Sequence, residues 1–229
     1  MLAAQLDAPA AHQRGTVVYP DSDGQPMADN TLQFNWIVLI KENLDSRLAD
    51  FVGGDLLWYP VLGDPKTRVA PDVLVALGRP KGYRGSYKQW EENDVPPRVV
   101  FEILSPGNRP AEMMRKQQFY DRFGVDEYYV IDPDESSVFG FVREGNKLVS
   151  VPAMDGFVSP SLGIRFELGE RLVLRHPDGT SFSTLAEERR RADEERARAD
   201  EEKVRAEASA QRAEVLAAKL RAAGLDPDA

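Results

Sequence analysis

The run VVFEIL, residues 99–104, constrains the fold strongly because it places one carboxylate inside an otherwise apolar segment. Pro96 and Pro97 precede the run and the turn-forming SPGN follows it, which is typical of a strand covered on both faces. An ionised glutamate in such a strand costs several kcal/mol unless a partner compensates its charge. The sequence therefore predicts a buried strand in which Glu102 has a specific partner.

The residue types that are absent or rare exclude several kinds of chemistry. The 229 residues include no cysteine, which excludes disulfides, thiolate zinc sites and cysteine nucleophiles. The two histidines are His12, near the N-terminus, and His176, in the turn-forming HPDG, so a histidine triad or metal cluster is not expected. No GxSxG motif or phosphate-binding glycine loop is present. Carboxylates and lysines remain as the candidate reactive groups.

The formal net charge of -9 argues at first against a nucleic-acid partner, because phosphate binding depends on lysine and arginine. Residues 181–229 hold 12 acidic and 10 basic side chains, so most of the net charge belongs to residues 1–180. A carboxylate site for a divalent cation would produce this balance, and so would an ordinary solvated surface.

Apolar spacing predicts the order αβββαβ for the folded part of the chain. Asp29 or Asn30 can cap a first helix, whose apolar positions run from Leu32 to Leu48. The elements expected after it are strands at 51–60, 68–77 and 98–104, a helix from Pro110 to a stop at Gly124, a strand at 126–132, and further hairpins up to residue 168. The expected organisation is an N-terminal arm (1–25), an α/β domain with a central mixed sheet (26–180) and a charged helical tail (181–229).

The segment 78–95, GRPKGYRGSYKQWEENDV, is polar and glycine-rich, and is expected to be a loop outside the core. Its basic residues alternate with aromatic ones, a composition suited to phosphate contact with base stacking. The predicted nucleic-acid-binding residues are Arg79, Lys81, Arg84 and Lys88. The alternative is a solvated insertion whose aromatic rings pack against the domain.

The tail repeats every seven residues from position 187, as EERRRAD, EERARAD, EEKVRAE and ASAQRAE. The pairs Glu187–Arg191, Glu194–Arg198 and Glu201–Arg205 have the i,i+4 spacing that supports a helix. Alanines share one heptad position, but glutamates occupy the matching second position, so a coiled-coil seam would be thin. The sequence predicts a long helix over about 183–222, either solitary or weakly paired through Leu216, Leu220 and Leu225.

Two carboxylates occupy similar places in the predicted strands. Asp72 follows Pro71 at the head of the apolar VLVAL, and Glu102 lies within VVFEIL. On neighbouring strands the two acids could hold Mg²⁺, which prefers carboxylate and water oxygens and could activate a water molecule. Lys116, on the helix after the Glu102 strand, could orient that water or stabilise charge on a phosphate, and Tyr120 lies one turn later on the same face.

Each of these residues also has a structural interpretation. Asp72 could cap a turn, Glu102 could form a buried ion pair with Lys116, and Lys116 could be a surface charge. Their joint order on the αβββαβ pattern favours a shared site.

Four motifs together resemble the Uma family of endonucleases, in the PD-(D/E)XK restriction-endonuclease-like superfamily. The motifs are PMADNTLQ, APDVLV, VVFEILSPGN and RKQQFYDRFGVDEYYVIDPD, and the resemblance covers roughly residues 18 to 170. It implies a restriction-endonuclease-like α/β fold that uses Mg²⁺, with Mn²⁺ as an alternative.

The resemblance also implies roles for particular residues. Asp72 corresponds to the aspartate of the PD element, and Glu102 to the acid of the second element. The usual lysine would fall at Leu104, and the resemblance implies that Lys116, on the following helix, takes its place in this family. Asp29 resembles an acidic position that some superfamily members use as an additional metal ligand.

The expected function is hydrolysis of phosphodiester bonds in nucleic acid, with DNA as the first candidate. The absence of a signal peptide and of an apolar run near the roughly 20 residues of a membrane helix predicts a cytoplasmic protein without a membrane partner. One alternative is a catalytically silent nuclease-fold module that binds nucleic acid or a partner protein. Another is an assembly protein, in which the tail helix mediates homo-oligomerisation.

Overall fold

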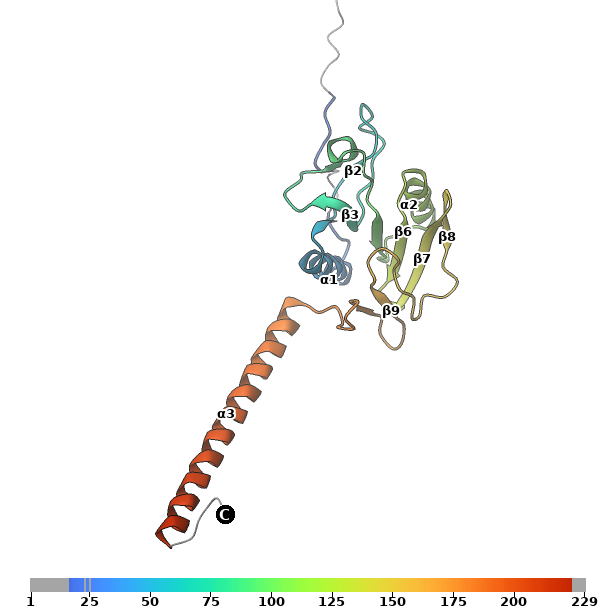
Figure 1. Cartoon of the computed structure of the whole chain (residues 1–229). Coiled ribbons are helices and arrows are strands. Elements are labelled where there is room, and N and C mark those ends of the chain that lie inside the picture. The colour runs from blue at the N-terminus through green and yellow to red at the C-terminus, as the bar shows by residue number, and fades with distance from the viewer. Residues whose placement is uncertain (1–16, 23, 25, 224–229) are drawn as a thin grey trace, which may run out of the picture. The chain divides into compact units, whose positions relative to one another are not determined.

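The computed structural model describes residues 17–22, 24 and 26–223, and its elements can be followed in Figure 1. The chain forms two compact units, with the division between Phe182 and Ser183. Most of the predicted arm, residues 1–16, lies outside the described residues. In the described part of the chain, no helix combines the length and the apolar character that crossing a bilayer requires.

Both helices predicted for the domain are present. α1 (Thr31–Arg47) begins after Asn30, whose side chain accepts a hydrogen bond of 2.8 Å from the Gln33 N–H. α2 (Pro110–Arg122) has proline in its first turn and ends just before Gly124, where φ is 88°. Glycine adopts this left-handed conformation at little steric cost, which explains why the helix ends there.

The domain is built on a six-stranded mixed sheet with the order β1-β3-β5-β6-β7-β8. The strands are β1 (Asp50–Gly54), β3 (Val73–Pro80), β5 (Val99–Ile103), β6 (Glu127–Asp132), β7 (Ser137–Glu144) and β8 (Lys147–Ser150). β5 and β6 are parallel and the other neighbours are antiparallel. The predicted αβββαβ order and central mixed sheet are therefore confirmed. Two small pairs complete the domain, β2 (Trp58–Tyr59) with β4 (Tyr87–Lys88) and β9 (Arg165–Glu167) with β10 (Val173–Arg175).

The two helices contribute to different apolar clusters on the sheet. Ile37, Ile40 and Leu44 of α1 belong to a cluster with Val73, Val75, Val99, Phe101 and Ile103. Tyr120 of α2 belongs to a second cluster with Leu74, Ala76, Val100 and Tyr128. Since successive strand residues point to opposite faces, α1 covers one face of the sheet and α2 covers the other. Asp72 and Glu102 lie two residues from Leu74 and Val100 along their strands, so their side chains point to the α2 face.

Two local expectations from the sequence are wrong. The strand expected at 51–60 is interrupted after β1, because Asp55 takes a left-handed φ of 44° and β2 then begins a separate pairing. The segment 78–95 is not a loop outside the core. It contains the end of β3, the strand β4 and a 3₁₀ helix (Gln89–Glu92), and Tyr87 is fully buried against the Phe51 ring.

The described end of the predicted arm packs against the domain. The Tyr19 ring contacts the rings of Tyr59 and Trp90, and the Tyr59 hydroxyl donates to the Pro20 carbonyl at 2.6 Å. The Ser86 hydroxyl donates to Asp21 at 2.9 Å. Residues 19–21 are therefore tied to the domain by both rings and hydrogen bonds.

The second unit consists mainly of α3 (Leu185–Ala222), which agrees with the helix expected over about 183–222. Thr184 and Glu187 form a capping box at its start, since Glu187 accepts from the Thr184 N–H at 2.8 Å and its own N–H donates to Thr184 Oγ1 at 3.3 Å. Leu216 is exposed, and Leu225 lies outside the described residues.

Candidate active site

Asp72 and Glu102 lie at neighbouring positions of two antiparallel strands. β3 pairs with β5 so that Val73 lies opposite Phe101, and continuing this register by one residue brings Asp72 opposite Glu102. Side chains in such positions have Cβ atoms about 5 Å apart. The Ile103 N–H donates to Asp72 Oδ2 at 2.6 Å, which holds the Asp72 carboxylate against β5. The structure thus brings the two predicted acids together.

Helix α2 supplies two donors to the Glu102 carboxylate. Lys116 Nζ lies 2.7 Å from Oε2, and the Tyr120 hydroxyl donates to Oε1 at 2.5 Å. The two donors are four residues apart, so they share one face of α2. The Tyr120 ring also stacks on Trp58, with centroids 6.3 Å apart and planes within 3° of parallel. Each Glu102 oxygen therefore has a hydrogen-bond partner, which confirms the expectation that this buried acid has a specific partner.

Burial makes the electrostatics of this group unusual. Glu102 is 2% exposed and Asp72 is 8% exposed. Burial and then the charge of Glu102 raise the pKa of Asp72 to about 8, although Lys116 and the Ile103 N–H act in the opposite direction. Burial alone would lower the pKa of Lys116, but the charges of Glu102 and Asp72 outweigh it, so that pKa is raised. Lys116 therefore remains an ammonium at neutral pH.

The carboxylate pair has the chemistry of a site for a hard divalent cation. Two buried carboxylates face one ammonium, so the group has a deficit of positive charge when both acids are ionised. Mg²⁺ is commonly bound through one or two carboxylates, with water and substrate phosphates as its other ligands. Asp72 and Glu102 fit this requirement and could hold such an ion.

Asp29, expected as a third metal ligand, is held elsewhere. Its carboxylate accepts a hydrogen bond of 2.5 Å from the Ser105 hydroxyl, and its N–H donates to Gln33 Oε1 at 2.8 Å. Among the residues that the structure describes, no group of three or more His, Cys, Asp or Glu side chains is arranged to hold a metal ion. The structure therefore does not bring Asp29 into one group with Asp72 and Glu102.

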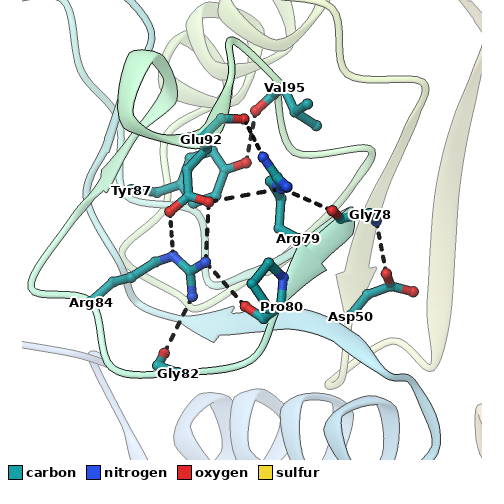
Figure 2. A network of polar contacts seen from close by, with 9 residues as sticks. All are labelled: Asp50, Gly78, Arg79, Pro80, Gly82, Arg84, Tyr87, Glu92 and Val95. Atoms are coloured by element: carbon teal, nitrogen blue, oxygen red, sulfur yellow. Dashed lines mark hydrogen bonds and ion pairs between the residues drawn. The ribbon is translucent and has the colours of Figure 1, made fainter.

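The two predicted arginines form a network with Glu92, shown in Figure 2. Arg84 donates to both oxygens of Glu92, through Nε at 2.6 Å and Nη2 at 3.1 Å. Arg79 donates to the Glu92 carbonyl at 2.9 Å and its Nε lies 4.0 Å from the carboxylate. The Arg84 guanidinium also covers the Phe51 ring at 3.9 Å. The two arginines thus have partners within their own segment, which fix its conformation.

The two predicted lysines of this segment are more accessible but are also paired. Lys81 Nζ lies 3.3 Å from Asp45 Oδ1 and is 44% exposed at its side chain. Lys88 Nζ lies 3.6 Å from the exposed Glu91. The structure does not bring these four basic residues together as one open patch, and their contact with nucleic acid remains a prediction.

Sequence reasoning missed two polar residues around the carboxylate pair. Gln33 donates to the Ile103 carbonyl at 2.9 Å, and so joins α1 to the strand that carries Glu102. A polar amide on the buried face of α1 is the sequence feature that could have indicated this contact. Tyr128 of β6 is 1% exposed, and its hydroxyl has no hydrogen-bond partner within the described residues. Its ring lies 5.0 Å from that of Tyr120, and no local pattern in EYYVID separates it from an ordinary core tyrosine.

The αβββαβ order on a mixed sheet defines an α/β protein of the restriction-endonuclease-like class. A family model described as "Uma2: Putative restriction endonuclease" matches residues 15–196, and the chain belongs to this family. A solved structure, described as a putative nuclease belonging to DUF820 from Anabaena variabilis, is similar with a TM-score of 0.41 and 19% identity. The similarity covers 58% of this chain and 72% of that one. No curated protein matches the chain.

Proposed function

We propose that the protein is a Mg²⁺-dependent endonuclease that hydrolyses phosphodiester bonds of nucleic acid, with DNA as the first candidate substrate and Mn²⁺ as an alternative metal. Membership of a restriction-endonuclease family supports the nuclease class. The observation that carries the proposal is the buried pair Asp72 and Glu102 beside Lys116, since two carboxylates with one ammonium are poorly compensated without a further cation.

The proposed roles follow from the contacts of each side chain. Asp72 and Glu102 would hold the divalent cation, which stabilises negative charge developing on a phosphate when it is bound. Lys116 keeps its proton at neutral pH, so it acts as a donor and a positive charge rather than as a general base. Tyr120 is a positioning residue, because its hydroxyl fixes Glu102 Oε1. Burial and then the charge of Glu102 raise the pKa of this hydroxyl, which keeps it a donor.

One observation favours a second candidate function. Both oxygens of Glu102 already accept hydrogen bonds from Lys116 and Tyr120, so Glu102 is compensated in part without a metal ion. A catalytically silent module that keeps this arrangement for stability, and binds nucleic acid or a partner protein, would have the same contacts.

A cleavage screen separates the two candidates. The purified chain would be incubated with single- and double-stranded DNA and RNA, in Mg²⁺, in Mn²⁺ and in EDTA. The endonuclease proposal predicts internal cleavage of at least one substrate with metal and none in EDTA, and loss of that cleavage in Glu102→Gln. Absence of cleavage under every condition by a correctly folded protein would favour the silent module.

A further inference from the structure

A cavity of about 390 Å³ lies beside the edge strand β1, outside the group of Asp72, Glu102 and Lys116. It is formed by α1, β1 and the glycine-containing segment that follows β3. Its lining residues are Lys41, Asp45, residues 51–54, Leu56 and residues 81–84. The volume lies within the range of cavities that bind small ligands.

The cavity adjoins the strand that carries Asp72. Gly54 lines it and pairs with Val73 in the ladder between β1 and β3. The Asp55 N–H, one residue further, donates to the Asp72 carbonyl at 3.0 Å. A Cβ atom at Gly54 would lie 3.5 Å from Lys41 Cγ and 3.8 Å from the Asp72 carbonyl oxygen. The cavity therefore borders the backbone at Asp72, and Gly54 faces α1 there, whereas the Asp72 and Glu102 side chains lie on the α2 face.

Two ammonium groups line the cavity and are held by one acid. Lys41 Nζ lies 3.2 Å from Asp45 Oδ2, and Lys81 Nζ lies 3.3 Å from Asp45 Oδ1. Lys41 also contacts Glu42, and Lys81 donates to the Asp45 carbonyl. An ammonium has three donors, so each lysine keeps one for a ligand. Burial acts to lower the pKa of Lys41, but its acidic neighbours raise it, so the positive charge is retained.

Tyr83 also lines the cavity, on a segment that neighbouring contacts hold in place. Tyr83 is 97% exposed, which is unusual for a tyrosine in a folded domain. It lies between Gly82, whose φ is 148°, and Arg84, which Glu92 and the Phe51 ring hold in place. Figure 2 shows how this network closes the segment around Gly82 and Arg84. The exposed ring is thus presented to solvent from a supported position.

From these features we infer that the cavity is a subsite for one nucleotide of a single-stranded segment of the nucleic acid. The inference rests on the proposed function. Lys41 and Lys81 would contact a phosphate and the Tyr83 ring would stack on a base. A base within a duplex is already paired and stacked on both faces, so it would have to be unstacked to occupy the cavity. The subsite therefore selects a single strand, or a frayed end, over an intact duplex.

The test is the affinity of the full-length protein for a fluorescein-labelled single-stranded oligodeoxynucleotide, measured by anisotropy in EDTA so that metal-dependent cleavage does not interfere. Tyr83→Ala should raise Kd about tenfold, the scale expected for one lost base–aromatic stack. Lys81→Gln should raise Kd and lower the salt dependence of binding. Tyr83→Phe should bind like the wild type. The matched controls are Phe139→Ala, an exposed ring on β7, and Lys66→Gln, an exposed lysine, and both should leave Kd unchanged.

Binding of Tyr83→Ala within twofold of the Phe139→Ala control would overturn the subsite, as would equal loss of affinity for the single strand and for the matched duplex. Melting temperatures equal to that of the wild type would show that each variant is folded. The two proposals fail separately. Cleavage by the wild type with no Tyr83 dependence would remove the subsite alone. Tyr83-dependent binding without cleavage in any metal would remove the endonuclease proposal and leave the subsite.

Discussion

Two carboxylates buried beside a single ammonium cost stability when both are ionised and no further cation is bound. This cost is clearest at Asp72, where burial and then the charge of Glu102 raise the pKa of the carboxyl group to about 8. The backbone N–H of Ile103 donates to the Asp72 carboxylate but does not offset both effects. Under the proposed function, stability and metal binding would therefore compete at this one residue.

We expect Asp72→Asn to raise the melting temperature of the metal-free protein while abolishing metal-dependent cleavage. The amide oxygen can still accept from Ile103, and the variant no longer has a carboxyl group that must either take up a proton or stay ionised in a buried place when the chain folds. Since the folded pKa of Asp72 exceeds its unfolded value of about 4, the folded state binds the extra proton between pH 4 and about 8. The unfolding free energy of the wild type should therefore fall as pH rises through this window.

Thermal denaturation in EDTA across that pH range tests this expectation. The Asp72→Asn variant should lack the part of the pH dependence that Asp72 contributes. Asp178→Asn serves as a control, since Thr180 and then Arg47 lower the pKa of that exposed carboxyl and its charge favours the folded state. A lower melting temperature for Asp72→Asn than for the wild type at pH 7 would contradict the competition between stability and metal binding.

Tyr128 allows a second test among the residues of the α2 face. Its buried hydroxyl has no partner within the described chain, and leaving such a group unsatisfied costs about 1–3 kcal/mol. Tyr128→Phe should therefore raise the unfolding free energy by about 1 kcal/mol, measured by urea denaturation. Tyr120→Phe should have the opposite sign, because it removes a hydrogen bond to Glu102.

Among the elements, the segment between β3 and β5 departs most from its sequence-based expectation. The sequence predicts that its basic residues contact nucleic acid, which stays a prediction, and the structure shows that Arg79 and Arg84 are paired with Glu92 of the same segment. Composition indicates which charges are present, but the pairing depends on how the segment folds back at Gly82 and enters the 3₁₀ helix. The network holds Arg84 in place, and so supports the backbone next to Tyr83.

Glu92→Ala should lower the unfolding free energy by about 2 kcal/mol, because it removes the carboxylate that accepts two hydrogen bonds from the partly buried Arg84 and lies 4.0 Å from Arg79. Glu91→Ala is the matched control. Glu91 is exposed and pairs with Lys88 at 3.6 Å, so its loss should cost less than about 0.5 kcal/mol. Equal effects of the two substitutions in chemical denaturation would show that the network does not hold the segment.

The sequence predicts much of the fold and of the carboxylate group because periodicity and order carry that information. Glu102 stands out as an acid in an apolar strand, and the spacing from Lys116 to Tyr120 places both on one helix face. Asp29 could not be placed in this way. Its position depends on the hydrogen bond from Ser105, 76 residues further along the chain, which no local pattern encodes. The break after β1 likewise depends on the left-handed φ of Asp55. Aspartate tolerates this conformation but does not dictate it, so the sequence alone does not predict the break.

For the whole molecule, the division after Phe182 separates the domain with the carboxylate pair from α3. The described side chains of α3 are nearly all exposed, including Val204, Val215 and Leu216. Ion pairs such as Arg190–Glu194, at 3.9 Å, are local to the helix. We propose that α3 serves association rather than catalysis, and a solitary helix stabilised by its own charge pairs is the alternative.

Deletion of residues 184–229 should leave the melting temperature of the domain unchanged and its cleavage rate within about twofold of the full chain, because the deletion keeps the domain unit intact. The mass in solution, measured by light scattering, should fall from that of an oligomer to that of a monomer. Leu216→Glu in the full chain should have the same effect on mass. An unchanged oligomeric state would remove the association proposal, and lost cleavage in a folded domain would show that α3 contributes to activity.

The proposal on which the others depend is that Asp72 and Glu102 bind a divalent cation that supports phosphodiester cleavage with the help of Lys116. It is tested by the single-turnover cleavage rate as a function of Mg²⁺ concentration, for the wild type, Asp72→Asn and Lys116→Ala, with metal affinity measured by calorimetry on the same proteins. We expect saturable activation of the wild type and loss of both metal binding and cleavage in Asp72→Asn. Lys116→Ala should retain most of its metal binding but cleave more slowly by about two or more orders of magnitude. Cleavage by Asp72→Asn at the wild-type rate, or Mg²⁺ binding that is unchanged in this variant, would contradict the proposal.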